Sequence, residues 1–165
     1  MNTGSNSFTI EISDLTALKN FAARLAGVLR PGDVLGLTGP MGAGKTTLIQ
    51  ALGQDMGINE KIVSPTFVLI HDYRSGRYPL VHVDLYRLGP ETAHSIADEV
   101  LSIIEEGRSL VAVEWVDYGA FLTPLVTINL TISTTGEQSR EVRVTTNCLD
   151  RRPDIQNALQ QGVTQ

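Results

Sequence analysis

The chain has 165 residues, the length of one compact domain, and 42% of them are apolar while 19% are charged. Its 13 basic and 18 acidic residues give a formal net charge of −5, which argues against a protein that grips a nucleic-acid backbone by itself. The single cysteine, Cys148, excludes a disulfide framework and a multi-cysteine zinc site. With no signal-peptide pattern and no apolar run of membrane-spanning length, we expect a cytoplasmic domain.

The first part of the chain predicts a strand, a helix, a second strand and a second helix. Residues 8–12 alternate apolar and polar side chains, as a half-buried strand does. A helix is predicted from the capping residue Asp14 until Pro31, with apolar residues at helical spacing: Leu15, Leu18, Ala22, Leu25 and Leu29. Residues 34–37 are a short apolar run typical of a fully buried strand. A Gly-rich turn leads from it into a helix over about 45–56.

The middle of the chain predicts a hairpin, a helix and another buried strand. Residues 67–73 and 79–86 read as two strands joined by a polar turn of hairpin length. A helix is predicted from residue 89 to residue 107, which is a glycine. Residues 109–114 form the next apolar run, again typical of a buried strand.

Two alternating runs, 125–133 and 140–146, predict an antiparallel hairpin near the C-terminus. Residues 150–165 are polar and Gln-rich, which indicates a frayed helix or a loose tail. Together the elements predict an α/β fold with a mostly parallel central sheet, antiparallel edge strands and flanking helices.

One motif points to a phosphate ligand. Residues 39–46 read Gly-Pro-Met-Gly-Ala-Gly-Lys-Thr and match G-x-x-x-x-G-K-[ST] in full. The motif follows an apolar strand and opens a helix, so its backbone N–H groups and the helix N-terminus converge on one point. Lys45 is expected to reach the β- and γ-phosphates, and Thr46 to bind Mg²⁺. We therefore predict a single P-loop nucleotide-binding domain over 1–149, followed by a polar tail over 150–165.

Two carboxylates stand where such a site needs them. Asp84 and Glu114 each end an apolar strand, and open α/β sheets place ligands at the carboxyl ends of their strands. Either carboxylate can hold Mg²⁺ while the other positions the attacking water, and spacing does not decide between them. The hydroxyls of Ser64 and Thr66 lie in a segment where nucleotide-sensing loops occur, although a plain turn is the alternative interpretation.

Other polar and aromatic residues carry weaker signals. His71, His82 and His94 share no metal-ligand spacing, and His82 is interpreted as a structural histidine within a strand. Trp115 follows Glu114 and belongs either to the core or to the flank of a site. Residues 147–150 lack the lysine of the guanine-reading N-K-x-D pattern, which disfavours guanine specificity.

Four segments together resemble the bacterial TsaE (YjeE) family of ATPases of tRNA threonylcarbamoyladenosine biosynthesis. They are the phosphate loop, Ser-Pro-Thr-Phe at 64–67, His-Val-Asp-Leu-Tyr-Arg-Leu at 82–88 and Val-Glu-Trp at 113–115. The resemblance runs from about residue 8 to residue 146. The last two segments are the most distinguishing, because a phosphate loop alone occurs in many unrelated NTPases.

The resemblance implies a site for ATP, ADP and Mg²⁺. It implies that the triphosphate is bound by residues of one loop: Gly39, Pro40, Met41, Gly42, Ala43, Gly44, Lys45, Thr46 and Thr47. It places Leu15 near the adenine and Arg140 close to the nucleotide. Metal binding is implied for Thr46, Glu114 and Asp84, and a catalytic role for Lys45, Asp84, Glu114 and Thr66.

The resemblance also implies partners. The family works with two paralogous subunits of a threonylcarbamoyl transferase that modifies adenosine 37 of tRNA, and ATP hydrolysis is expected to reset that complex between turnovers. The chain would then meet tRNA only indirectly and would bind neither DNA nor a membrane. Pro40 stands where the family usually has an acidic residue, and His71 where it often has Glu or Asn; these departures bear on turnover and partner contacts.

Two other functions fit the motif. A small-molecule P-loop kinase shares the size and the loop, but such enzymes have an Arg-rich lid and an acceptor pocket of helices where this chain predicts a strand hairpin. A nucleotide-responsive binding module without catalysis is the other alternative. It would associate with partners in a nucleotide-dependent way and produce no ADP.

Overall fold

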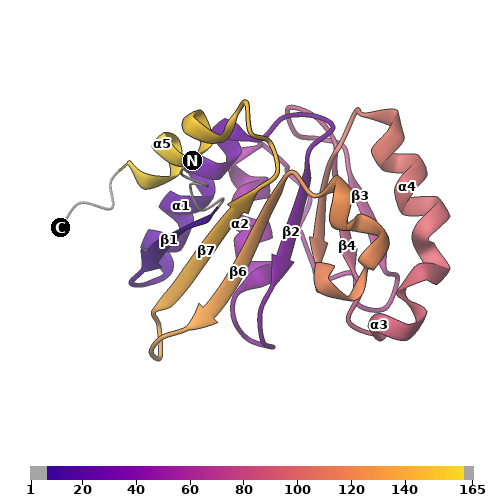
Figure 1. Cartoon of the computed structure of the whole chain (residues 1–165), viewed down its shortest axis with the longest axis horizontal. Helices are drawn as coiled ribbons and strands as arrows, with labels where there is room; N and C mark the ends of the chain where they lie inside the picture. Colours follow the sequence, from indigo (N-terminus) through magenta and orange to yellow (C-terminus); the bar gives the residue numbers. More distant parts are fainter. Residues whose placement is uncertain (1–6, 162–165) are drawn as a thin grey trace, which may run out of the picture.

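The fold is built around one seven-stranded sheet with helices on both of its faces (Figure 1). The structure is a computed structural model and describes residues 7–161. The strands are β1 (Ser7–Ile12), β2 (Val34–Thr38), β3 (Ile70–Tyr73), β4 (Leu80–Asp84), β5 (Leu110–Glu114), β6 (Ile128–Thr134) and β7 (Arg140–Thr146). The helices are α1 (Leu15–Val28), α2 (Lys45–Asp55), α3 (Gly89–Thr92), α4 (Ala97–Glu106) and α5 (Arg152–Gln160), with short 3₁₀ turns η1 (Ala93–Ile96), η2 (Val116–Tyr118) and η3 (Ala120–Leu125).

The strand order is β1-β7-β6-β2-β5-β4-β3. The four central strands, β6, β2, β5 and β4, run parallel to one another, whereas β3, β7 and β1 each pair antiparallel with their neighbours. This confirms the predicted α/β fold with a mostly parallel centre and antiparallel edges. Among residues 7–161, no helix has the length and apolarity needed to cross a bilayer.

Successive residues of the central strands face two separate apolar cores. In β2, Leu35 and Leu37 pack with α1, α2 and α5, while Val34 packs on the opposite face with the α4 side. In β5, Ala112 belongs to the first core and Val113 to the second. Because β2, β4 and β5 are covered on both faces, their sequences are mainly apolar rather than alternating, whereas β6 alternates and buries Ile128, Leu130 and Ile132 in the first core.

Two predicted elements differ from the structure. The strand predicted over 67–73 begins only at Ile70, because Leu69 takes the left-handed conformation (φ 69°) and its N–H bonds back to the carbonyl of Pro65. The helix predicted over 89–107 is broken into α3, η1 and α4, since Thr92 and Ile96 have ψ near 0° and interrupt the α-helical ladder.

The C-terminal segment contains a helix that packs on the domain. α5 buries Ile155 and Leu159 in the core shared with α1, and these are the apolar anchors that the sequence interpretation missed. Arg151, just before α5, makes a paired contact with Asp33 at 2.7 and 3.0 Å. Residues 162–165 of the predicted tail lie outside the described residues, and the division at residue 149 stays a prediction.

Candidate functional site

The phosphate-loop motif forms the connection between β2 and α2. Gly42 and Gly44 have φ of 79° and 106°, a left-handed backbone that other residues rarely adopt. A Cβ on Gly39 would lie 2.5 Å from the carbonyl oxygen of Ile132, so only glycine fits there. No side chain caps α2, which leaves the N–H groups of its first turn open to a ligand.

Lys45 is held at the centre of this loop. Its Nζ donates to the carbonyl oxygens of Gly39 and Pro40 at 2.7 and 2.9 Å and lies 4.2 Å from the ring centroid of Trp115. Burial lowers the pKa of Lys45 below the ordinary lysine value of 10.5, although Glu114 and other nearby carboxylates act in the opposite direction.

Glu114 joins three elements at one carboxylate oxygen. Its Oε1 accepts a hydrogen bond from Thr46 Oγ1 at 2.6 Å and another from His82 Nε2 at 2.9 Å. His82 is fully buried on β4, and its Nδ1 has no hydrogen-bond partner among residues 7–161. The contact fits an Nε2 that carries a proton and donates to the carboxylate of Glu114.

Asp84 holds the segment between α2 and β3. Its Oδ2 accepts from the hydroxyls of Ser64 and Thr66, both at 3.1 Å, and its Oδ1 accepts from the N–H of Tyr86 at 2.9 Å. Asp84 and Glu114 are direct partners in the parallel pairing of β4 and β5. The sheet register thus sets the two predicted carboxylates side by side.

These groups surround one cavity of about 250 Å³. The structure brings together the predicted catalytic and metal-binding residues Lys45, Thr46, Thr66, Asp84 and Glu114. The other residues that line this cavity are Met41, Gly42, Gly44, Thr47, Ser64, Tyr86 and Trp115. Gly39 and Pro40 do not line it; their carbonyls hold Lys45 instead.

A second cavity of about 450 Å³ shares Gly42, Gly44 and Thr47 with the first and has a more apolar lining. Leu15 and Ala43 lie in it, beside the phosphate loop. Arg140 also lines it, but its guanidinium donates to the carbonyl oxygen of Ala43 at 2.9 Å and to carbonyls of its own hairpin. The hydrogen bonds of Arg140 are therefore made to the backbone of the phosphate loop and of the β6–β7 hairpin.

Sequence interpretation missed one contributor to the site, His82, and left open whether Trp115 belongs to the core or flanks the site. His82 was interpreted as structural, yet it contacts Glu114; its spacing of two from Asp84 on one strand face was the available signal. Trp115 flanks Lys45 and lies in a row of aromatic rings with Tyr86 and Tyr118, at centroid distances of 5.0 and 5.2 Å. Trp115 has φ of 57°, a backbone strained for a non-glycine residue.

The donor set fits a magnesium–nucleotide complex rather than a metal ion alone. Among residues 7–161, no three His, Cys, Asp or Glu side chains gather as a metal site. Thr46 and Glu114 offer a hydroxyl and a carboxylate, two hard oxygen donors. Mg²⁺ bound this way takes its remaining oxygens from substrate phosphates and water.

The chain is similar to known proteins over most of its length. Residues 12–142 match the model of the family described as "Threonylcarbamoyl adenosine biosynthesis protein TsaE". The chain is 41% identical over 141 residues to a tRNA threonylcarbamoyladenosine biosynthesis protein TsaE of Nostoc sp. PCC 7120, covering 84% of this chain and 86% of that one. It is 35% identical to the Bacillus subtilis protein of the same name, covering 77% and 78%. The crystal structure of Bacillus subtilis YdiB is similar with a TM-score of 0.74 and 26% identity, covering 96% and 97%.

Proposed function

The chain belongs to the TsaE family, and from that premise we propose that it is a Mg²⁺-dependent ATPase that supports N6-threonylcarbamoyladenosine formation at position 37 of tRNA. The observation that carries the proposal is the contact of Thr46 with Glu114, beside Lys45, in one cavity. A metal-binding hydroxyl, an acidic group and a phosphate-loop lysine are the parts that phosphoryl transfer to water requires.

Each group has a role in this proposal. The loop amides and Lys45 bind the β- and γ-phosphates, and Lys45 exchanges its bonds to the carbonyls of Gly39 and Pro40 for bonds to phosphate oxygens. Thr46 and Glu114 would hold Mg²⁺, which neutralises charge developing on the phosphates. Asp84 orients the attacking water. Thr66 donates a hydrogen bond to Asp84, so the position of the 64–66 segment is coupled to the position of that carboxylate.

The charge at the site supports a partner-stimulated reaction. Lys45 is the one cationic side chain among the described residues that line the smaller cavity, and the donors of Arg140 are taken up by backbone carbonyls. An arginine supplied by another protein is a known way to complete such a site. We propose that two paralogous transferase subunits stimulate the ATPase and are reset by it, so that tRNA is reached only through them, in the cytoplasm.

Reconstitution with the two transferase subunits tests this proposal. ADP production and multiple-turnover tRNA modification are measured with and without the chain. We expect both ADP production and multiple-turnover modification to require the chain and to be lost in Lys45→Ala and Glu114→Ala. The matched Lys61→Ala changes an exposed lysine that does not line the nucleotide cavity and should behave as wild type. Repeated turnover of the transferase without the chain would contradict the resetting role.

The small-molecule kinase alternative has less support. Its acceptor pocket would be built from helices following α2, and in this chain residues 70–84 form the β3–β4 hairpin. ATP-dependent phosphorylation of a metabolite, unaffected by the transferase subunits, would favour it over the proposal.

A further inference from the structure

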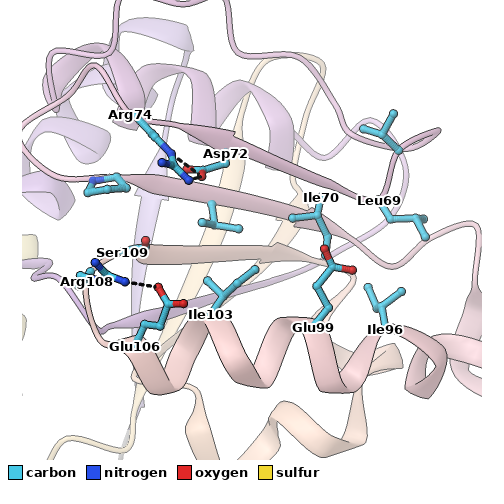
Figure 2. A pocket seen from close by; sticks show the side chains of 13 residues that line it. Leu69, Ile70, Asp72, Arg74, Ile96, Glu99, Ile103, Glu106, Arg108 and Ser109 are labelled. Carbon is cyan, nitrogen blue, oxygen red and sulfur yellow. Dashed lines mark hydrogen bonds and ion pairs between the residues drawn. The ribbon is translucent and has the colours of Figure 1, made fainter.

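A groove of about 560 Å³ lies between the edge strand β3 and helix α4. It shares no lining residue with the cavity that holds Lys45 and Glu114. Figure 2 shows side chains from the strands and from α4 pointing into the space between them. Its aliphatic lining, called the floor below, includes Leu69, Ile70, Val81, Ile96 and Ile103.

The groove runs beside an open sheet edge. Among the strands that the structure describes, β3 is the last of the sheet and pairs on one side only, with β4. The N–H of Asp84 donates to the carbonyl of Leu69, so Leu69 and Asp84 form a hydrogen-bonded pair. Hydrogen-bonded and non-hydrogen-bonded pairs alternate along an antiparallel ladder, so Ile70 and Asp72 belong to the non-hydrogen-bonded pairs of β3 and β4. Ile70 and Asp72 therefore direct their backbone N–H and C=O groups to the open edge, and both line the groove.

The charged rim has one carboxylate without a partner. Asp72 pairs with Arg74 at 2.7 Å and Glu106 with Arg108 at 3.0 Å. Glu99 makes no hydrogen bond or ion pair among the residues that the structure describes, and Figure 2 shows it rising from α4 toward Ile70. Three acidic against two basic side chains leave the rim with a net charge of −1.

We propose that this groove binds an extended segment of a partner protein, which adds a strand to β3. Its backbone pairs with Ile70 and Asp72, an aliphatic side chain covers the floor, and a lysine or arginine lies against Glu99. A second copy of this chain fits poorly, because two such edges would set one acidic rim against the other. The proposal rests on the proposed function, since the partner is sought in the transferase complex.

One segment connects this groove to the nucleotide cavity. Ser64 and Thr66 bond to Asp84 in that cavity, whereas Val68 and Leu69, two and three residues beyond Thr66, line the groove. Leu69 has a strained left-handed backbone. A displacement of Thr66 along the chain would therefore be transmitted to the groove through the backbone of Leu69. Nucleotide and partner then bias the same segment, and the effect of each on the affinity of the other must be reciprocal.

Two variants and a matched control test the groove. Glu99→Arg reverses the unpaired charge, and Asp72→Pro removes the N–H offered to the incoming strand at a position where an edge strand tolerates proline. Glu105→Arg makes the same charge change on α4 outside the groove. Binding to the purified transferase complex is measured by titration calorimetry in the presence of ATP, and ADP binding by each isolated variant reports an intact nucleotide cavity.

We expect Glu99→Arg and Asp72→Pro to weaken binding to the complex by about 10-fold or more, with Glu105→Arg and all ADP affinities unchanged. Wild-type binding by both groove variants would overturn the groove proposal and leave the proposed function standing. No binding of the wild-type chain to the complex would overturn both. Self-association of the wild type that Glu99→Arg alters would show a second copy as the occupant and would overturn the choice of partner.

Discussion

The hydroxyl of Thr46 lies 2.6 Å from Oε1 of Glu114, although 68 residues separate them in the chain. The parallel pairing of β2 with β5 brings Leu37 opposite Glu114, and α2 begins a short loop after β2. The contact is therefore a product of sheet register. It sets the first residues of α2 against the carboxyl end of β5, where the proposed chemistry takes place.

Removing the negative charge of Glu114 is expected to abolish ATP hydrolysis while ATP binding is kept. Glu114→Gln keeps the shape of the side chain but removes the negative charge that would face Mg²⁺. We expect ADP production with the transferase complex to fall by about 100-fold or more, while ATP binding persists. Glu105→Gln, which makes the same change at an exposed position that lines neither the groove nor the nucleotide cavity, serves as the control. Wild-type turnover by Glu114→Gln would contradict the assigned role.

His82 positions Glu114 through its Nε2. His82→Leu leaves the carboxylate held by Thr46 alone, and we expect activity or Mg²⁺ affinity to fall by about 10–100-fold. His82→Gln retains a donor near the same place and should recover most of the loss. Activity is measured across a Mg²⁺ titration, with melting curves for all three proteins. Equal activity of the Leu and Gln variants, at equal melting temperature, would show that the ring is merely filling space.

The lowered pKa of Lys45 predicts a pH dependence of nucleotide binding. The ammonium attracts phosphates only while it is protonated, so affinity is full at low pH and is lost as pH rises through the lowered pKa. We expect ADP affinity to begin falling at a lower pH than the ordinary lysine value of 10.5 would give. Lys45→Arg, which stays charged throughout, should bind more weakly but without this fall.

The contact between Asp33 and Arg151 predicts a stability effect at the C-terminal helix. The pair is bidentate, and its side chains are only 8% and 16% exposed. Asp33→Asn leaves the guanidinium poorly compensated, and we expect the free energy of unfolding in urea to fall by about 2 kcal/mol. Breaking the exposed Arg108–Glu106 pair by Arg108→Ala should cost less than about 1 kcal/mol.

The sequence predicted the parallel core and the phosphate loop well, because both depend on local signals. Continuous apolar runs indicate strands buried on both faces, and the motif fixes a strand–loop–helix unit around Lys45. Asp84 and Glu114 were predictable as candidates, since each ends such a run. Their adjacency depends on strand order, which no local pattern specifies.

Contacts between distant elements were beyond prediction. The bond of His82 to Glu114 requires β4 and β5 to be neighbours in register. The hydrogen bond from the guanidinium of Arg140 to the carbonyl of Ala43 joins residues that are 97 positions apart in the chain. The break at Thr92 and the short β3 depend on single backbone torsions, at Thr92 and at Leu69. The anchoring of α5 by Ile155 and Leu159 was hidden by the polar composition around them.

The sheet order also governs when the protein becomes functional during its synthesis. β2, which leads into the phosphate loop, pairs on its two sides with β5 and β6, and among the described strands β1 pairs with β7 alone. A ribosome that has made the loop and α2 has therefore made none of the strands that hold them in place. Nascent chains should acquire nucleotide affinity late and abruptly, when residues beyond 134 have emerged, and fragments that stop earlier should resist refolding.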